Sequence, residues 1–293
     1  MNYRHAFHAG SFADVVKHAV LSRLMVHLCG KPAAYRAIDT HAGAGLYDLA
    51  GPEAGRSGEW RNGIGRLMDG GLLDGGLPGA GSEGSLRALL APYLDAVAAC
   101  NPPGRLTTYP GSPALMRAFL RAQDRLVACE LEPNAAACLE RNFGQDRRIK
   151  VIAIDGWTAL NAYVPPKERR GLALIDPPFE DGGDFPRLAH GLQAAHRKWA
   201  NGTYLLWYPI KAREEPDALA RRLRRSGIGK ILRAEVSIAP LLDPARLAGC
   251  GLILVNPPWT LERELRIMLP ALVPILAGAD RGGARIDWIS GEM

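Results

Sequence analysis

The chain has 293 residues, of which 47% are apolar, so it can bury one large core and is expected to fold as a single domain over residues 1–293. Its five cysteines form no C-x-x-C pair, and no segment approaches the roughly 20 apolar residues that span a bilayer. These features exclude a disulfide scaffold and predict a cytoplasmic protein with no membrane segment and no metal site. The net charge of +6 suits an anionic partner such as a nucleic acid. A monomer is expected, although no sequence feature fixes the oligomeric state.

Aromatic and basic side chains crowd the first ten residues without any apolar periodicity. Tyr3, Arg4 and His5 are interpreted as part of an arm, residues 1–10, that contacts the substrate, although a frayed terminus could have the same composition. A metal ion is not expected there, because no acidic residue adjoins His5 and His8.

Residues 11–29 carry apolar side chains at helical spacing, with Ser11 in the N-cap position and Asp14 three residues later. This pattern predicts the first helix of the chain. Lys17 and His18 lie on it, and the periodicity leaves open whether they face a cofactor or solvent.

A short strand over 35–39 is predicted to run into the turn His41-Ala42-Gly43-Ala44-Gly45. Glycines let the backbone approach a ligand closely, and such a turn is typical of the first crossover of a doubly wound sheet. Residues 46–105 are irregular and rich in glycine, with a helix-like run over 86–100, and predict an inserted helical subdomain. Ser112 is then expected to cap a helix that continues to about residue 123.

Six further apolar runs predict strands, which brings the sheet to seven strands. The first four are separated by segments long enough for crossover helices and should be parallel, whereas the connection between the last two is too short and predicts an antiparallel pair. These strands are predicted over 125–131, 149–154, 171–175, 203–208, 231–238 and 251–255. The pattern resembles the α/β fold of class I S-adenosylmethionine methyltransferases, a Rossmann-like seven-stranded sheet whose last hairpin is antiparallel, here with a small helical insertion.

The motif Asp176-Pro177-Pro178-Phe179 follows the strand predicted over 171–175, at the carboxyl end where open α/β sheets bind ligands. It matches the D/N-P-P-aromatic signature of amino methyltransferases. The lone pair of an adenine amino group is delocalised into the ring, so the nitrogen attacks poorly until its hydrogens are held. Asp176 and the Pro177 carbonyl are predicted to hold them, while Phe179 stacks on a flipped base.

Asn256-Pro257-Pro258-Trp259 repeats this pattern after another apolar strand. That strand is predicted to be antiparallel, so its carboxyl end would lie at the opposite edge of the sheet. Asp176 is therefore taken as the catalytic carboxylate, and Asn256 is not.

Acidic residues end two of the other predicted strands. Glu130 is placed to bind the ribose hydroxyls of a cofactor. Asp155, which Gly156 follows, is placed to accept a hydrogen bond from the adenine amino group of the same cofactor. Either residue could instead only cap the helix that follows it. A nicotinamide cofactor is disfavoured because G-x-G-x-x-G is absent.

Together with Tyr109-Pro110-Gly111-Ser112-Pro113 and the segments 3–10 and 13–18, these motifs resemble the bacterial RlmJ family along nearly the whole chain. The resemblance implies N6 methylation of an adenine in large-subunit (23S) ribosomal RNA, with S-adenosylmethionine as cofactor. It also implies that Asp176 is catalytic, that Tyr3 meets the RNA and that Lys17 lies nearby. The residues that it assigns to the cofactor are His18, His41, Ser112, Glu130, Asp155 and Gly156. Phe179 stands where the family usually has tyrosine.

Three other functions are weighed against this one. A DNA adenine-N6 methyltransferase shares the four-residue motif but usually has a larger target-recognition segment than residues 46–105 supply. A non-catalytic RNA-binding protein on the same fold would be expected to lose the cofactor positions, which are intact here. A small-molecule methyltransferase would leave basic runs such as 221–225 without a purpose.

Overall fold

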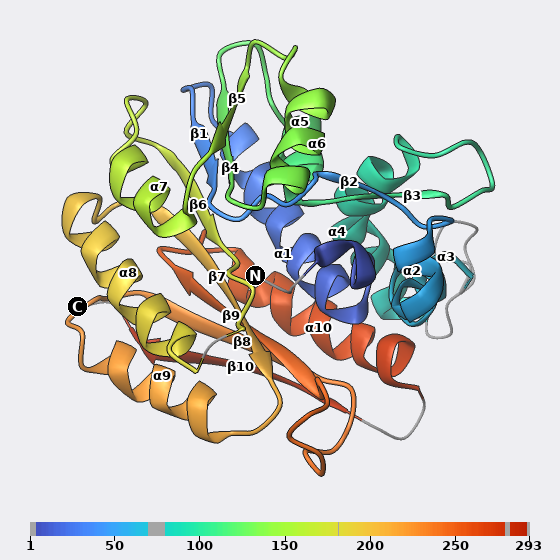
Figure 1. Cartoon of the computed structure of the whole chain (residues 1–293). Helices are drawn as coiled ribbons and strands as arrows, with labels where there is room; N and C mark the ends of the chain where they lie inside the picture. The colour runs from blue at the N-terminus through green and yellow to red at the C-terminus, as the bar shows by residue number, and fades with distance from the viewer. Residues whose placement is uncertain (1–3, 70–79, 181, 279–281, 292–293) are drawn as a thin grey trace.

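A computed structural model describes residues 4–69, 80–180, 182–278 and 282–291 (Figure 1). Tyr3 and most of the glycine-dense stretch lie outside the described residues. Eight strands form one sheet in the order β10-β8-β9-β7-β6-β1-β4-β5, and two short strands form a second. The strands of the large sheet are β1 (Arg36–Asp39), β4 (Arg125–Glu130), β5 (Ile149–Ala153), β6 (Gly171–Ile175), β7 (Thr203–Ile210), β8 (Ile231–Ser237), β9 (Gly249–Val255) and β10 (Gly283–Ser290).

All seven predicted strands are present, and the antiparallel pairing of β8 with β9 is confirmed. Strands β1, β4, β5, β6 and β7 are parallel, as the crossover lengths predict. This is the class I methyltransferase fold. The count of seven is wrong, because β10 adds an eighth strand at the edge, antiparallel to β8. Ile289 is the one buried residue of β10, so the strand lacks the continuous apolar run that marks a central strand.

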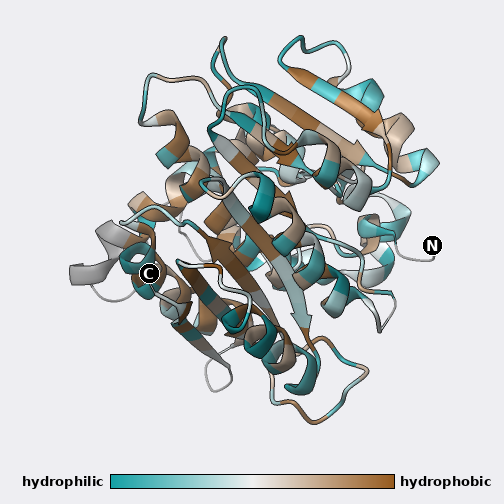
Figure 2. Ribbon diagram, turned by 90° about the vertical axis from the view of Figure 1, so that its left-hand side faces the viewer, coloured by the Kyte–Doolittle hydropathy of each residue, from teal (hydrophilic) through white to brown (hydrophobic). Residues whose placement is uncertain are grey.

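Helices cover both faces of the sheet (Figure 1). One face is covered by α1 (Phe12–Cys29), α4 (Ala80–Ala98), α5 (Ser112–Ala118), α6 (Pro133–Phe143) and α10 (Leu261–Ala277). The other is covered by α7 (Gly156–Tyr163), α8 (Asp184–Lys198) and α9 (Glu214–Arg224). Alternate strand residues enter the two cores, so the central strands are apolar on both sides, as Figure 2 shows in brown. None of the described helices is long and apolar enough to cross a membrane.

Helix α1 lies between the sheet and α4 and α10, and it is buried on nearly every side. The Ser11 hydroxyl accepts a hydrogen bond from the Asp14 backbone N–H at 3.5 Å, which confirms the N-cap. Lys17 and His18 are 4% and 1% exposed. Neither side chain therefore faces solvent.

The N-cap predicted at Ser112 is wrong. Gly111 occupies that position in an extended conformation, Ser112 is the first residue of α5, and the helix ends at Ala118. A glycine can take the N-cap position at little cost, and this leaves the Ser112 hydroxyl free of a capping role. Ser112 is buried beside Asp39 instead.

Residues 46–105 contain β2 (Leu46–Asp48), α2 (Pro52–Ser57), a 3-10 turn (Glu59–Asn62), α3 (Ile64–Asp69) and α4. Strand β2 pairs with β3 (Thr108–Pro110), and α4 packs against α1 and α10. Leu90 and Tyr93 of α4 belong to the same core as α1. The segment therefore shares the main core, and its description as an inserted subdomain stays a prediction.

Candidate active site

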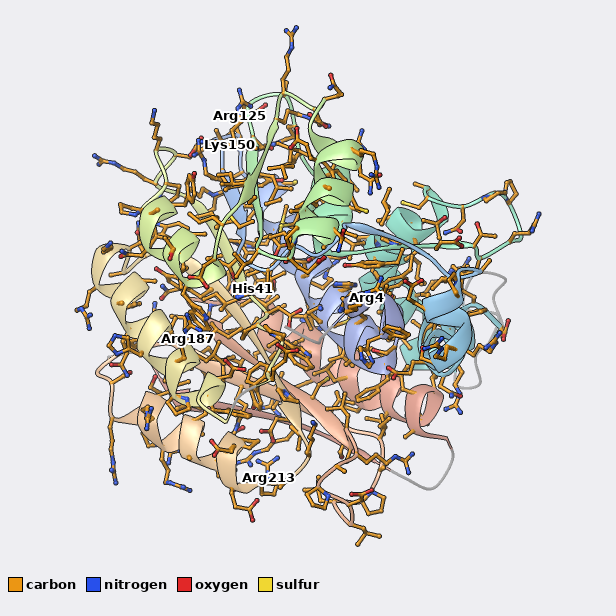
Figure 3. All side chains as sticks on the ribbon, in the orientation of Figure 1. Arg4, His41, Arg125, Lys150, Arg187 and Arg213 are labelled. Atoms are coloured by element: carbon orange, nitrogen blue, oxygen red, sulfur yellow. The ribbon has the colours of Figure 1, made fainter. Side chains whose placement is uncertain are left out.

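A cleft of about 1180 Å³ opens at the carboxyl ends of β1, β4 and β6. The N-terminal segment, the glycine turn after β1 and the start of α7 all line it. Figure 3 shows His41 near the middle of the molecule, between Arg4 on one side and Arg187 on the other. The predicted catalytic and cofactor residues, from Lys17 to Phe179, are brought together in this cleft.

Lys17 joins two carboxylates inside the cleft. Its ammonium lies 2.5 Å from Asp176 Oδ2 and 2.9 Å from Asp14 Oδ1. All three groups are largely buried, and the side chains of Asp14 and Asp176 are 3% and 15% exposed. Burial disfavours the charges, but Asp14 and Asp176 still raise the pKa of Lys17 well above its ordinary value, and the pKa of Asp14 is lowered well below its own. Both groups are therefore charged at neutral pH.

The N-terminal arm is tied to this cluster through Asp14. Its Oδ2 accepts from the Gly10 N–H at 2.9 Å and lies 3.1 Å from His5 Nε2. Arg4 instead pairs with Glu53 of α2 at 2.8 Å. The expectation that His5 and His8 lack acidic neighbours is wrong in three dimensions, because Asp14 and Glu59 are their partners. No group of three or more metal-ligating side chains occurs within the described ranges.

Glu130 shapes the glycine turn. One carboxylate oxygen accepts from the Gly43 N–H and the other from the N–H groups of Leu131 and Glu132, each at 2.8 Å. Gly43 has a φ of +61°, and a Cβ there would collide with the Tyr47 hydroxyl. A fixed carboxylate beside a turn without side-chain bulk fits a polar ligand that approaches the backbone closely.

Asp155 caps α7, because its Oδ2 accepts from the Thr158 N–H at 2.8 Å and from the Thr158 hydroxyl at 2.9 Å. A Cβ on Gly156 would collide with the Thr40 carbonyl oxygen and the His41 ring. Burial lowers the pKa of His41 to about 4, so this imidazole is neutral at pH 7. His41 is held by Thr40 Oγ1 at 2.8 Å from Nδ1.

His18 is also buried and neutral, since burial lowers its pKa well below the ordinary value. Its Nδ1 lies 2.8 Å from the Tyr109 hydroxyl, and the two rings stack with centroids 5.6 Å apart. Its Nε2 has no hydrogen-bond partner among the described residues. A buried polar atom without a partner fits a site that a ligand completes.

Asp39 ends β1 just before the glycine turn and was not predicted as a site residue. It does not line the cleft itself but lies near Ser112 and Asp176, which do. It is fully buried, and neither carboxylate oxygen accepts a well-formed hydrogen bond from a described residue. Burial raises the pKa of Asp39 to about 7, although the nearby Ser112 side chain lowers this pKa in part. An acidic residue at the end of the first strand was the available signal.

Asp39→Asn should stabilise the cofactor-free protein at pH 8, by up to about 4 kcal/mol. Asp39 in the unfolded chain ionises near pH 4, whereas in the folded chain it ionises near pH 7. As the pH rises from about 4 to about 7, the wild-type protein therefore loses stability, whereas the Asp39→Asn protein does not. Urea unfolding at pH 4 to 8 measures this, and parallel pH profiles for the two proteins would contradict it.

The Asp176-Pro177-Pro178-Phe179 motif lines the cleft as predicted. Phe179 has a φ of +52°, and its ring centroid lies 5.7 Å from that of Trp207 and 5.0 Å from that of Phe185. Trp207 of β7 also lines the cleft and was not predicted as a site residue. Phe179 and Trp207 form an apolar wall of the cleft that also holds Asp176, and Phe185 packs against Phe179.

Asn256 lies at the other edge of the sheet, as predicted. Its side chain donates to the carbonyl oxygens of Ala200 and Gly202, at 2.8 and 2.7 Å, just before β7 begins. Asn256 is therefore at the amino ends of the parallel strands, and Asp176 is at their carboxyl ends.

Comparisons with known proteins show the family to which the chain belongs. The family model described as "Ribosomal RNA large subunit methyltransferase D, RlmJ" matches residues 32–290. The chain is 38% identical to an Escherichia coli protein and 36% identical to a Haemophilus influenzae protein, both named "Ribosomal RNA large subunit methyltransferase J", over the full length of each chain. A solved Legionella pneumophila protein shares 32% identity, with 96% of this chain and 98% of that one covered and a TM-score of 0.85. The chain therefore belongs to the RlmJ family of S-adenosylmethionine-dependent methyltransferases.

Proposed function

We propose that this protein methylates the N6 amino group of one adenine in 23S ribosomal RNA. The observation that carries the proposal is the placement of Asp176, ion-paired with buried Lys17, at the mouth of a cleft walled by Phe179 and Trp207. The names of the relatives support ribosomal RNA of the large subunit as the substrate. We place the protein in the cytoplasm as a monomer.

The cofactor residues would act as follows. Glu130 would take the ribose hydroxyls, and Asp155 the adenine amino group, with Gly43 and Gly156 leaving room for the ligand. Bound S-adenosylmethionine supplies an electrophilic methyl group. His18, His41 and Ser112 would complete the cofactor site with uncharged hydrogen-bond donors and acceptors.

Asp176 would accept a hydrogen bond from one hydrogen of the target amino group, and the Pro177 carbonyl oxygen would accept a hydrogen bond from the other. Holding both hydrogens directs the nitrogen lone pair out of the adenine ring, which makes the nitrogen a better nucleophile. Lys17 compensates the charge of Asp176 and fixes its position. Phe179 would stack on the extruded base, and the arm with Tyr3, Arg4 and His5 would contact the RNA.

Glu130→Gln should weaken binding of S-adenosylmethionine by about tenfold, because it removes a charged acceptor from the ribose hydroxyls. Isothermal titration measures the dissociation constant. Glu140→Gln is the matched control, since Glu140 is exposed on α6 and is not among the residues that line the cleft. Equal affinities for wild type and Glu130→Gln would contradict this assignment.

The substrate class is tested by incubating the protein with methyl-labelled S-adenosylmethionine and either unmodified large-subunit RNA or duplex DNA. We expect methyl transfer to the RNA, and we expect that excess duplex DNA does not suppress it. Transfer to DNA would favour the DNA adenine methyltransferase. Cofactor binding with no transfer to either would overturn the proposed substrate, and RNA binding with no cofactor binding would favour the non-catalytic alternative.

A further inference from the structure

The basic residues of this chain are concentrated in the segments that precede β5, β6, β7 and β8. Segments 144–148, 164–170, 197–202 and 221–230 together hold twelve Arg and Lys residues but only two acidic residues. Their net charge of +10 exceeds the +6 of the whole chain, so the remainder is net negative. These four segments are called the basic edge below.

The basic edge is one continuous side of the sheet. Strands β5, β6 and β7 are parallel, and β8 is parallel to β7 because both are antiparallel to β9. Six strand spacings separate β5 from β8, which is roughly 29 Å at about 4.8 Å each. Figure 3 shows Arg125 and Lys150, at the starts of β4 and β5, at the end of the molecule away from Arg213, with His41 of the cleft between.

Each of the two acidic residues of the basic edge pairs with an arginine, and Asp146 neutralises a cation of the edge itself. Asp146 pairs with Arg148 at 2.6 Å, and Glu168 pairs with Arg36 of β1 at 2.9 Å. Basic residues at the ends of α8 and α9 also complement the helix dipoles. Arg147 and Lys167, however, lie outside helices and are exposed, so helix capping does not account for them.

The catalytic cleft has the opposite charge. Ten Asp and Glu residues line it, against five Arg and Lys. This balance suits a cationic sulfonium cofactor, but it repels the phosphates of an RNA strand. Apart from the N-terminal arm, the affinity for the RNA backbone is therefore expected to come from another surface.

The unused motif Asn256-Pro257-Pro258-Trp259 lies on the basic edge. The Asn256 N–H donates to the Lys230 carbonyl at 3.1 Å, and its side chain bonds to residues 200 and 202. Trp259, three residues on, is 89% exposed. An exposed aromatic ring on a positively charged side of a protein can bind an unpaired nucleotide, because the base stacks on the ring and the phosphates contact the cations.

We propose that the basic edge, with Trp259, is a second RNA-binding surface that holds phosphates and an unpaired base of the substrate far from the target adenine. This inference rests on the proposed function and extends it to the opposite end of the sheet. The strands between the two sites have five to eight residues, or roughly 17–26 Å, a span that a folded RNA can cover.

The first test is a charge-matched pair of double variants. Lys167→Gln with Arg225→Gln removes two charges from the basic edge, and Arg61→Gln with Arg105→Gln removes two exposed charges elsewhere. Methylation kinetics on unmodified large-subunit RNA should show KM raised about tenfold in the edge variant, with kcat unchanged. The slope of log Kd against log salt should become shallower by about 1.4, since each phosphate contact contributes roughly 0.7.

The second test concerns Trp259. Trp259→Leu should weaken binding of the RNA by about tenfold, and Trp259→Tyr should restore most of it, because tyrosine keeps a stacking face. A merely apolar contact would be retained by leucine.

The outcomes separate this inference from the proposed function. On a short hairpin that carries only the target adenine, the edge variant should equal wild type, because such an RNA cannot reach both sites. If wild type methylates large-subunit RNA and the edge variant matches its control, the inference is wrong and the basic edge serves another partner, such as an acidic protein. If wild type methylates no RNA, the proposed function itself fails.

Discussion

Asp176→Asn is expected to lower the methylation turnover by about 10²–10³-fold, the range for loss of one positioned hydrogen-bonding group at the reacting atoms. The amide keeps a single acceptor oxygen, which cannot serve both Lys17 and the target amino group, and it removes the negative charge that pairs with Lys17. Single-turnover transfer to the RNA measures the loss.

Cofactor affinity is the control for this variant, because Asp176 is not among the residues expected to bind S-adenosylmethionine. The dissociation constant of the cofactor should change less than about threefold, well under 1.4 kcal/mol. Near-normal turnover in Asp176→Asn would show that another group holds the amino hydrogens.

Lys17→Met should lower the free energy of unfolding by about 3–5 kcal/mol, since it leaves the buried carboxylates of Asp14 and Asp176 without their shared cation. Urea unfolding at pH 7 measures this. Turnover should fall as well, because Asp176 loses the contact that positions it.

A double variant provides the matched control. Lys17→Met with Asp14→Asn removes one positive and one negative charge, so it should recover a large part of the lost stability. If the double variant is no more stable than Lys17→Met, the loss comes from packing rather than from the unpaired charge.

The central sheet could be predicted because its strands are apolar on both faces and the crossovers between them have characteristic lengths. The position of Asp176 and the exclusion of Asn256 followed from strand direction alone, and the structure places them at opposite ends of the sheet. Strand β10 could not be recognised in the same way, because an edge strand with one buried residue has no such pattern.

The polar contacts of the site could not be predicted, because they join residues far apart in the chain. Asp14 fitted the pattern of a capping residue, and nothing local indicates that it pairs with Lys17 and His5. Lys17 and Asp176 are 159 residues apart, and only the packing of α1 under the sheet brings them together. The full burial of Asp39 likewise depends on the elements around β1.

Identification of the methylated nucleoside tests both the target amino group and the role of Asp176. Unmodified 23S ribosomal RNA is incubated with S-adenosylmethionine and either wild type or Asp176→Asn, digested with nucleases and analysed by mass spectrometry. We expect N6-methyladenine at a single site with wild type and almost none with the variant. A methyl group on another base or on a ribose, or equal N6-methyladenine from both proteins, would contradict it.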